Sequence, residues 1–196
     1  NAGFRAIDTA NQPKHYSEPL VGEALEVLGK DGIPRESLFL QTKFTPLNGH
    51  DSRVPYDPGA GLKTQVRQSF ESSLRNLNTS RVDSYLLHGP YSYPGLGAPD
   101  WGVWGVIEEI YRSGRAGMIG ISNVLPGQLA DLIDKAGVKP MVVQNRCFAN
   151  RGWDRGPRRP TSKDGGAGGA ATIEARSRPR GLDTLSLRPN LVSPWV

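Results

Sequence analysis

The feature that most constrains the fold of this chain is a series of five short apolar runs, each of which ends in polar residues. The runs are GFRAID, LFLQTK, DSYLLH, GMIGISN and MVVQN, and they end at Asp8, Lys43, His88, Ser122 with Asn123, and Gln144 with Asn145. A segment with helical periodicity lies between each pair of successive runs, and a parallel sheet built from right-handed crossovers requires this alternation. In a closed (β/α) barrel the carboxyl ends of the strands meet at one mouth, so we expect these polar side chains to surround one pocket.

The segments between the runs carry apolar stripes that predict four helices. The stripes are Val21, Ala24, Leu25 and Leu28; Val66, Phe70, Leu74 and Leu77; Val106, Ile107, Ile110 and Tyr111; and Leu129, Leu132, Ile133 and Ala136. The runs themselves are almost continuously apolar, which is typical of strands covered on both faces. Two long loops, residues 45–61 and 89–101, follow Lys43 and His88 and are rich in Gly, Pro and aromatic residues. We interpret them as walls of a substrate pocket, with surface insertions as the alternative.

The charge of the chain is unevenly distributed. Residues 1–150 hold 15 basic and 15 acidic side chains, whereas residues 151–196 hold 9 and 4, so the whole net charge of +5 comes from the last quarter. A neutral body argues against nucleic acid or a membrane surface as a partner. A single cysteine excludes an intramolecular disulfide and indicates a reducing, cytoplasmic setting. No segment approaches the roughly 20 apolar residues of a membrane span, and none resembles a signal peptide.

Several of these motifs, taken in order, resemble the aldo-keto reductases. They are GFRAIDTA, Tyr16 followed by Glu18 and VGEAL, LQTKF, SYLLHGP, GMIGISNV and VVQN, and together they cover roughly residues 3–150. The resemblance implies an α/β fold, a partial (β/α)8 TIM barrel of about five strand–helix units over residues 1–150. It also implies reduction of an aldehyde or ketone to an alcohol with NADPH, and a small-molecule carbonyl substrate.

By the same resemblance, Asp8, Tyr16, Lys43 and His88 match the catalytic tetrad of the family. Hydride transfer to a carbonyl carbon leaves negative charge on the oxygen, which needs a proton donor and a hydrogen-bond donor. Tyr16 is the expected proton donor, with Lys43, held by Asp8, lowering the pKa of the phenol. His88 would orient the carbonyl. Tyr16 lies farther from Asp8 than in most of the family, and the adjacent His15 leaves a second alignment open.

Ser122, Asn123 and Gln144 match the family residues that hydrogen-bond the nicotinamide carboxamide. Each assignment has an ordinary structural alternative. Ser122 and Asn123 could cap the following helix, Asp8 could be a surface or capping carboxylate, and His88 could be a buried core histidine. No metal site is predicted.

The resemblance ends after Trp153, Asp154 and Arg155. Residues 151–196 form a Gly/Pro/Arg-rich tail whose composition predicts disorder, and a shifted reading frame from about Gly156 is the alternative origin. The first strand and the last units of a barrel are not recognisable, and the family residues that clamp the adenosine half of NADPH would lie in those units. The alternative function is therefore a catalytically inactive truncated remnant, or an interaction partner that completes its barrel by association. The pattern leaves open the carbonyl substrate, the choice between NADPH and NADH, and the oligomeric state.

Overall fold

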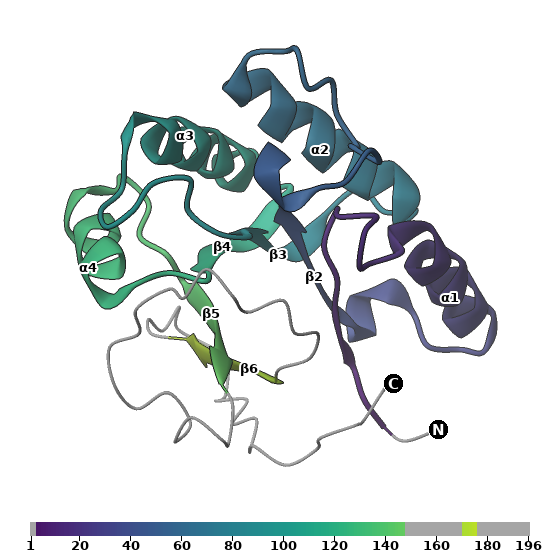
Figure 1. The fold of residues 1–196 in the computed structure, drawn as a ribbon. Coiled ribbons are helices and arrows are strands. Elements are labelled where there is room, and N and C mark those ends of the chain that lie inside the picture. The colour runs from purple at the N-terminus through teal and green to yellow at the C-terminus, as the bar shows by residue number, and fades with distance from the viewer. Residues whose placement is uncertain (1–2, 148–169, 176–196) are drawn as a thin grey trace.

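The structure, a computed structural model, describes residues 3–147 and 170–175, which form one curled sheet with helices along its outer side (Figure 1). The sheet has the order β1-β2-β3-β4-β5-β6. Its strands are β1 (Ala6–Asp8), β2 (Phe39–Phe44), β3 (Val82–Leu87), β4 (Ala116–Ser122), β5 (Val142–Cys147) and β6 (Ala170–Ala175). Strands β1 to β5 pair in parallel, each with the next in sequence. The predicted series of five strand units in a partial barrel is therefore confirmed.

One helix connects each pair of consecutive parallel strands. The helices are α1 (Glu18–Lys30), α2 (Leu62–Asn76), α3 (Ala98–Arg112) and α4 (Pro126–Lys135), and two short 3₁₀ turns, η1 (Arg35–Ser37) and η2 (Leu47–Gly49), flank β2. Proline stands in the first turn of α1, α3 and α4, where its missing N–H has no helical partner to lose. Asp100 adds a cap to α3, because its carboxylate accepts the N–H of Gly97 at 2.9 Å.

The core lies between the sheet and helices α2 and α3. Phe70 of α2 packs edge-on against Tyr85 of β3 with 4.7 Å between ring centroids, and Trp104 and Ile107 of α3 are almost fully buried. The stripe predicted for α2 is buried throughout. Burial of this apolar surface is the main term that holds these two helices on the sheet.

The β1 end of the sheet is less covered than the sequence pattern indicates. On α1, Ala24 is exposed, and Leu20 and Val27 are 61% and 55% exposed. Strand β1 has only β2 as a neighbour and is largely exposed. The expectation of strands covered on both faces thus holds for β2 to β4 and is wrong for β1, because an edge strand beside a single helix has fewer elements to cover it.

Strand β6 lies within the segment predicted to be a tail. It pairs antiparallel with β5, with Gln144 opposite Ile173, and the sequence pattern did not indicate it. The remainder of the predicted tail, residues 151–169 and 176–196, lies outside the described residues, as does the junction at Trp153 to Gly156. Over the described part of the chain, no helix combines the length and apolar character needed to cross a bilayer.

Candidate active site

The predicted site residues gather at the carboxyl ends of the parallel strands. Asp8 ends β1, Lys43 is the second-last residue of β2, and His88 follows β3. Ser122 ends β4 and is in register with Gln144 of β5. Tyr16 reaches the same mouth from the turn before α1, where its backbone N–H donates to the carbonyl of Gln12 at 3.0 Å.

An ion pair between a buried ammonium and a partly exposed carboxylate joins the first two strands. The Nζ of Lys43 lies 2.6 Å from Oδ1 of Asp8 and donates to the backbone oxygen of Thr9 at 2.8 Å. The Lys43 side chain is 2% exposed, whereas that of Asp8 is 42% exposed. Burial lowers the pKa of Lys43, and the Asp8 carboxylate opposes that shift. A buried ammonium is strongly destabilising without such partners, so the pair is bound tightly into the structure.

The phenol of Tyr16 lies beside this pair and beside His88. Lys43 Nζ is 5.7 Å from the centre of the Tyr16 ring, and the rings of Tyr16 and His88 meet edge-on with 5.9 Å between centroids. Burial and then the Asp8 carboxylate raise the pKa of Tyr16, against a weaker lowering by Arg146. The expectation that this pKa is lowered is therefore wrong for this arrangement, because burial, followed by the Asp8 carboxylate, disfavours the phenolate.

His88 is held as a neutral imidazole. Burial, followed by the positive charge of Lys43, lowers its pKa to about 4. Its Nδ1 lies 2.7 Å from the hydroxyl oxygen of Thr45. When the Thr45 hydroxyl donates to Nδ1, the ring proton lies on Nε2, where it can be donated to a ligand.

Amide and hydroxyl groups form the other side of the mouth. The Ser122 hydroxyl donates to the backbone oxygen of Gln144 at 2.7 Å. Asn123 has a left-handed backbone with φ +52°, and its Nδ2 donates to the backbone oxygen of His88 at 2.8 Å and to the Ser122 hydroxyl at 3.2 Å. The alternative that these residues cap the next helix is wrong, because the N-cap of α4 is Leu125.

Sequence reasoning missed three polar residues around the site: Gln41, Thr45 and Glu18. The first two could have been found, because side chains at alternate positions of a strand share a face and Lys43 lies between them. Glu18 is 3% exposed and accepts the Thr42 hydroxyl at 2.5 Å, and burial raises its pKa. Sequence gives no such signal for Glu18, since Glu in the first turn of a helix is usually solvated.

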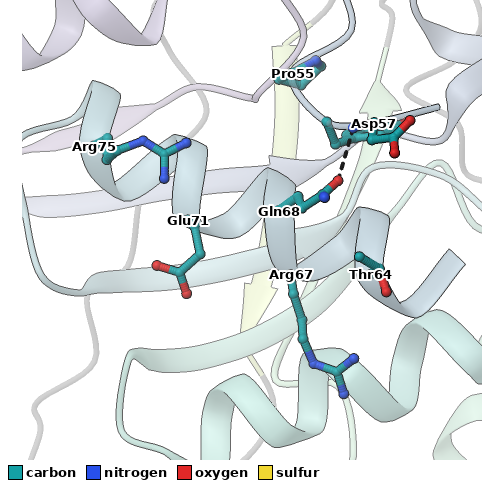
Figure 2. Close-up of a pocket in the computed structure, with 8 residues that line it drawn as sticks. Pro55, Asp57, Thr64, Arg67, Gln68, Glu71 and Arg75 are labelled. Carbon is teal, nitrogen blue, oxygen red and sulfur yellow. Dashed lines mark hydrogen bonds between the residues drawn. The ribbon is translucent and has the colours of Figure 1, made fainter. Parts of the chain in front are cut away.

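A separate pocket lies on the outside of the molecule, between α2 and the loop after β2 (Figure 2). It measures about 470 Å³, and Arg67, Glu71 and Arg75 point along its wall. Glu71 accepts two hydrogen bonds from Arg115, and Arg67 donates to Glu109 at 2.6 Å. None of the tetrad residues lines this pocket. Because the charged side chains of this outer pocket are largely paired with other residues, we place the candidate active site at the strand ends instead.

These observations define half of a (β/α) barrel. At its mouth lie an ion pair between a buried lysine and an aspartate, a tyrosine and a histidine. In the described part of the chain, no group of three or more His, Cys, Asp or Glu side chains could hold a metal ion. The model of the aldo/keto reductase family matches residues 1–151, and the chain belongs to this family.

Relatives of known sequence and structure agree with this assignment. The NADPH-dependent alpha-keto amide reductase of Saccharomyces cerevisiae is 33% identical over 145 residues, which are 72% of this chain and 40% of that protein. Glyoxal reductase of Bacillus subtilis is 32% identical over 142 residues, with 72% and 44% covered. A Brucella melitensis aldo/keto reductase structure aligns with a TM-score of 0.58 at 30% identity, covering 74% and 48%. A Bombyx mori aldo-keto reductase in complex with NADP aligns with the same score at 25% identity, covering 74% and 44%. The chain thus spans less than half the length of each of these relatives.

Proposed function

We propose that this chain carries the catalytic half of an NADPH-dependent carbonyl reductase, which reduces an aldehyde or ketone to an alcohol with Tyr16 as the proton donor. The observation that carries the proposal is the ion pair between buried Lys43 and Asp8, beside the rings of Tyr16 and His88. A relative named for NADPH-dependent reduction, and a related structure in complex with NADP, support the choice of cofactor. We further propose that residues 1–150 are the functional unit and that residues 151–196 are a tail that this unit does not require, although β6 within it pairs with β5.

The residues at the ends of β4 and β5 fit a nicotinamide carboxamide, which offers two N–H donors and one oxygen acceptor. Asn123 is exposed and uses its Nδ2 within the protein, so its Oδ1 is available to accept an N–H. Gln144 donates one of its two amide hydrogens to Asp8 at 2.8 Å, which leaves the second for the carboxamide oxygen. Ser122 holds Asn123 in place. The bound cofactor would supply the hydride, and these three residues would set the orientation of its ring.

The protein groups then have distinct tasks. The raised pKa of Tyr16 keeps the phenol protonated at neutral pH, so it can act as an acid. As the substrate oxygen gains charge, Tyr16 transfers its proton to that oxygen, and the nearby Lys43 ammonium stabilises the phenolate that forms. Neutral His88 donates a hydrogen bond to the same oxygen and thereby orients the carbonyl.

A non-catalytic role, or completion of the barrel by a partner, is the second candidate. It is favoured by the edge strand β1, whose single neighbour among the described strands is β2. The apolar side chains of Phe4, Leu20 and Val27 are more than half exposed near this edge.

The deciding experiment is NADPH binding to the purified 196-residue chain, followed by nicotinamide fluorescence, together with turnover of a simple aldehyde. We expect Tyr16→Phe to bind NADPH as the unaltered chain does while losing at least about 100-fold in kcat, the scale of general acid catalysis. Lys43→Met should weaken both properties. A folded chain that neither binds NADPH nor reduces the aldehyde would refute the catalytic proposal and favour the second candidate. Limited proteolysis that removes residues 151–196 without loss of binding would support the proposed division of the chain.

A further inference from the structure

A closed ring of hydrogen bonds links Asp8, Gln41 and Gln144 inside the curl of the sheet. Gln41 Nε2 donates to Asp8 Oδ1 at 2.8 Å and to Gln144 Oε1 at 3.3 Å. Gln144 Nε2 donates in turn to Asp8 Oδ2 at 2.8 Å. The three residues belong to β2, β1 and β5, and β1 and β5 are not neighbours in the sheet. The ring therefore spans the barrel interior through side chains alone.

This ring determines how the Asp8 carboxylate is held. Asp8 Oδ1 accepts from both Lys43 and Gln41, and Oδ2 accepts from Gln144, so both oxygens are fixed. The Asp8 side chain is 42% exposed and lies on a three-residue edge strand, where a carboxylate with one partner would have other rotamers open to it. Gln41, in contrast, is fully buried and its two donors point at fixed acceptors. Gln41 is thus the most buried member of the ring.

The orientation of Asp8 is transmitted to the rest of the site through Lys43. The ammonium has two partners, Asp8 Oδ1 and the backbone oxygen of Thr9, and both belong to the end of β1. A rotation of the Asp8 carboxylate would therefore move or loosen the ammonium that stands beside the Tyr16 ring. Small displacements of this kind reduce rates strongly, because the proton donor and its supporting charge act only at short range.

We propose that Gln41 is a positioning residue of this active site, which fixes the Asp8 carboxylate, and through it the Lys43 ammonium, by donating to both Asp8 and Gln144. The inference rests on the proposed function for its catalytic part. It also gives Gln144 a second task, since this side chain belongs to the ring and to the proposed carboxamide site. Bound cofactor and the Asp8–Lys43 pair would then share one amide.

The first test reads the ring without any turnover. In the full-length chain labelled with ¹⁵N, Asp8→Asn should shift the side-chain amide resonances of Gln41 and Gln144, because a charged acceptor is lost. The matched control is Gln128, which is also buried but donates to the backbone oxygens of Ser92 and Gly95. Its resonance should stay in place. Unchanged Gln41 signals in the Asp8→Asn variant would overturn the proposal, whether or not the chain is an enzyme.

The second test compares Gln41→Met with Gln128→Met. Both variants replace a buried glutamine with a methionine of similar size, so both lose the same amide group. Only Gln41→Met should lower kcat for carbonyl reduction, by about tenfold, while the KM for NADPH stays within about twofold. Equal kcat losses in the two variants, or none in Gln41→Met, would overturn a positioning role. Absence of turnover in the unaltered chain would refute the proposed function instead, and the resonance test would still decide the ring. If Gln41→Met does not fold, the resonance test alone decides the proposal.

Discussion

The contact between α1 and the end of α2 leads to a prediction about Gly22. A Cβ placed on this residue would lie 2.1 Å from the backbone oxygen of Asn76 and 3.3 Å from the backbone carbon of Leu77. Ordinary contacts begin near 3.4 Å, so Gly22→Ala must push α1 away from α2 by roughly 1 Å. Such a movement also strains the buried hydrogen bond between Glu18 and Thr42.

The size of the stability change follows from one favourable and two unfavourable contributions. Alanine gains about 1 kcal/mol over glycine inside a helix. Overpacking costs about 1 to 3 kcal/mol, and loss of a buried hydrogen bond to a carboxylate costs a further 1 to 3 kcal/mol or so. We therefore expect Gly22→Ala to lower the free energy of unfolding by about 1 to 5 kcal/mol, which at its upper end is a large share of the stability of a typical domain.

The matched control lies in the same helix. Gly29 has open space around the same position, so Gly29→Ala should raise the free energy of unfolding by about 0.5 to 1 kcal/mol. Urea unfolding followed by circular dichroism measures both changes. If the two alanine variants were equally stable, the close approach of α1 and α2 would be refuted.

Two further predictions concern buried ionisable groups. Burial raises the pKa of Glu18 above its ordinary 4.5, so folding favours the protonated carboxyl. The free energy of unfolding should therefore fall as pH rises from about 4.5 through the raised pKa. Glu18→Gln should flatten this decline when it is measured by urea unfolding, and an unchanged decline would contradict the assignment to Glu18. His88, with its pKa of about 4, should stay neutral from pH 8 down to about pH 5 in an NMR titration of its ring. Its contribution to stability is complete above about pH 6.5 and is lost as pH falls towards 4. An imidazole that titrates near 6.5 would show that His88 is not buried as described.

The sequence was sufficient for the order of the helices and strands from β1 to β5 and for the residues at the ends of these strands. Apolar runs that end in Asp8, Lys43 and His88 place these side chains at one mouth because parallel strands must align their carboxyl ends. The apolar stripe on α2 predicts its buried face for a similar reason, since a helix that connects two strands of a sheet packs one face against that sheet. Tyr16 was identified through resemblance, because its turn has no periodic pattern.

Other features depend on tertiary contacts that no local pattern contains. The exposure of Ala24 and of β1 follows from their place at the end of the sheet. The raised pKa of Tyr16 follows from its burial in the folded chain and then from the Asp8 carboxylate, so an expectation drawn from the neighbouring residue types alone had the wrong direction. The strand alternation places Gln41 on the face of Lys43, but its partners Asp8 and Gln144 are known only when β1 and β5 are brought together.

The ring formed by Asp8, Gln41 and Gln144 also has a consequence for the order of folding. Its bond between Asp8 and Gln144 joins residues 136 positions apart, whereas each strand of the parallel sheet pairs with its nearest neighbour in sequence. Closing so long a loop is entropically unfavourable until the intervening units are in place. We therefore expect the mouth of the barrel to be assembled after the β2 to β4 core and to open before it, so that hydrogen exchange at the site precedes exchange in that core.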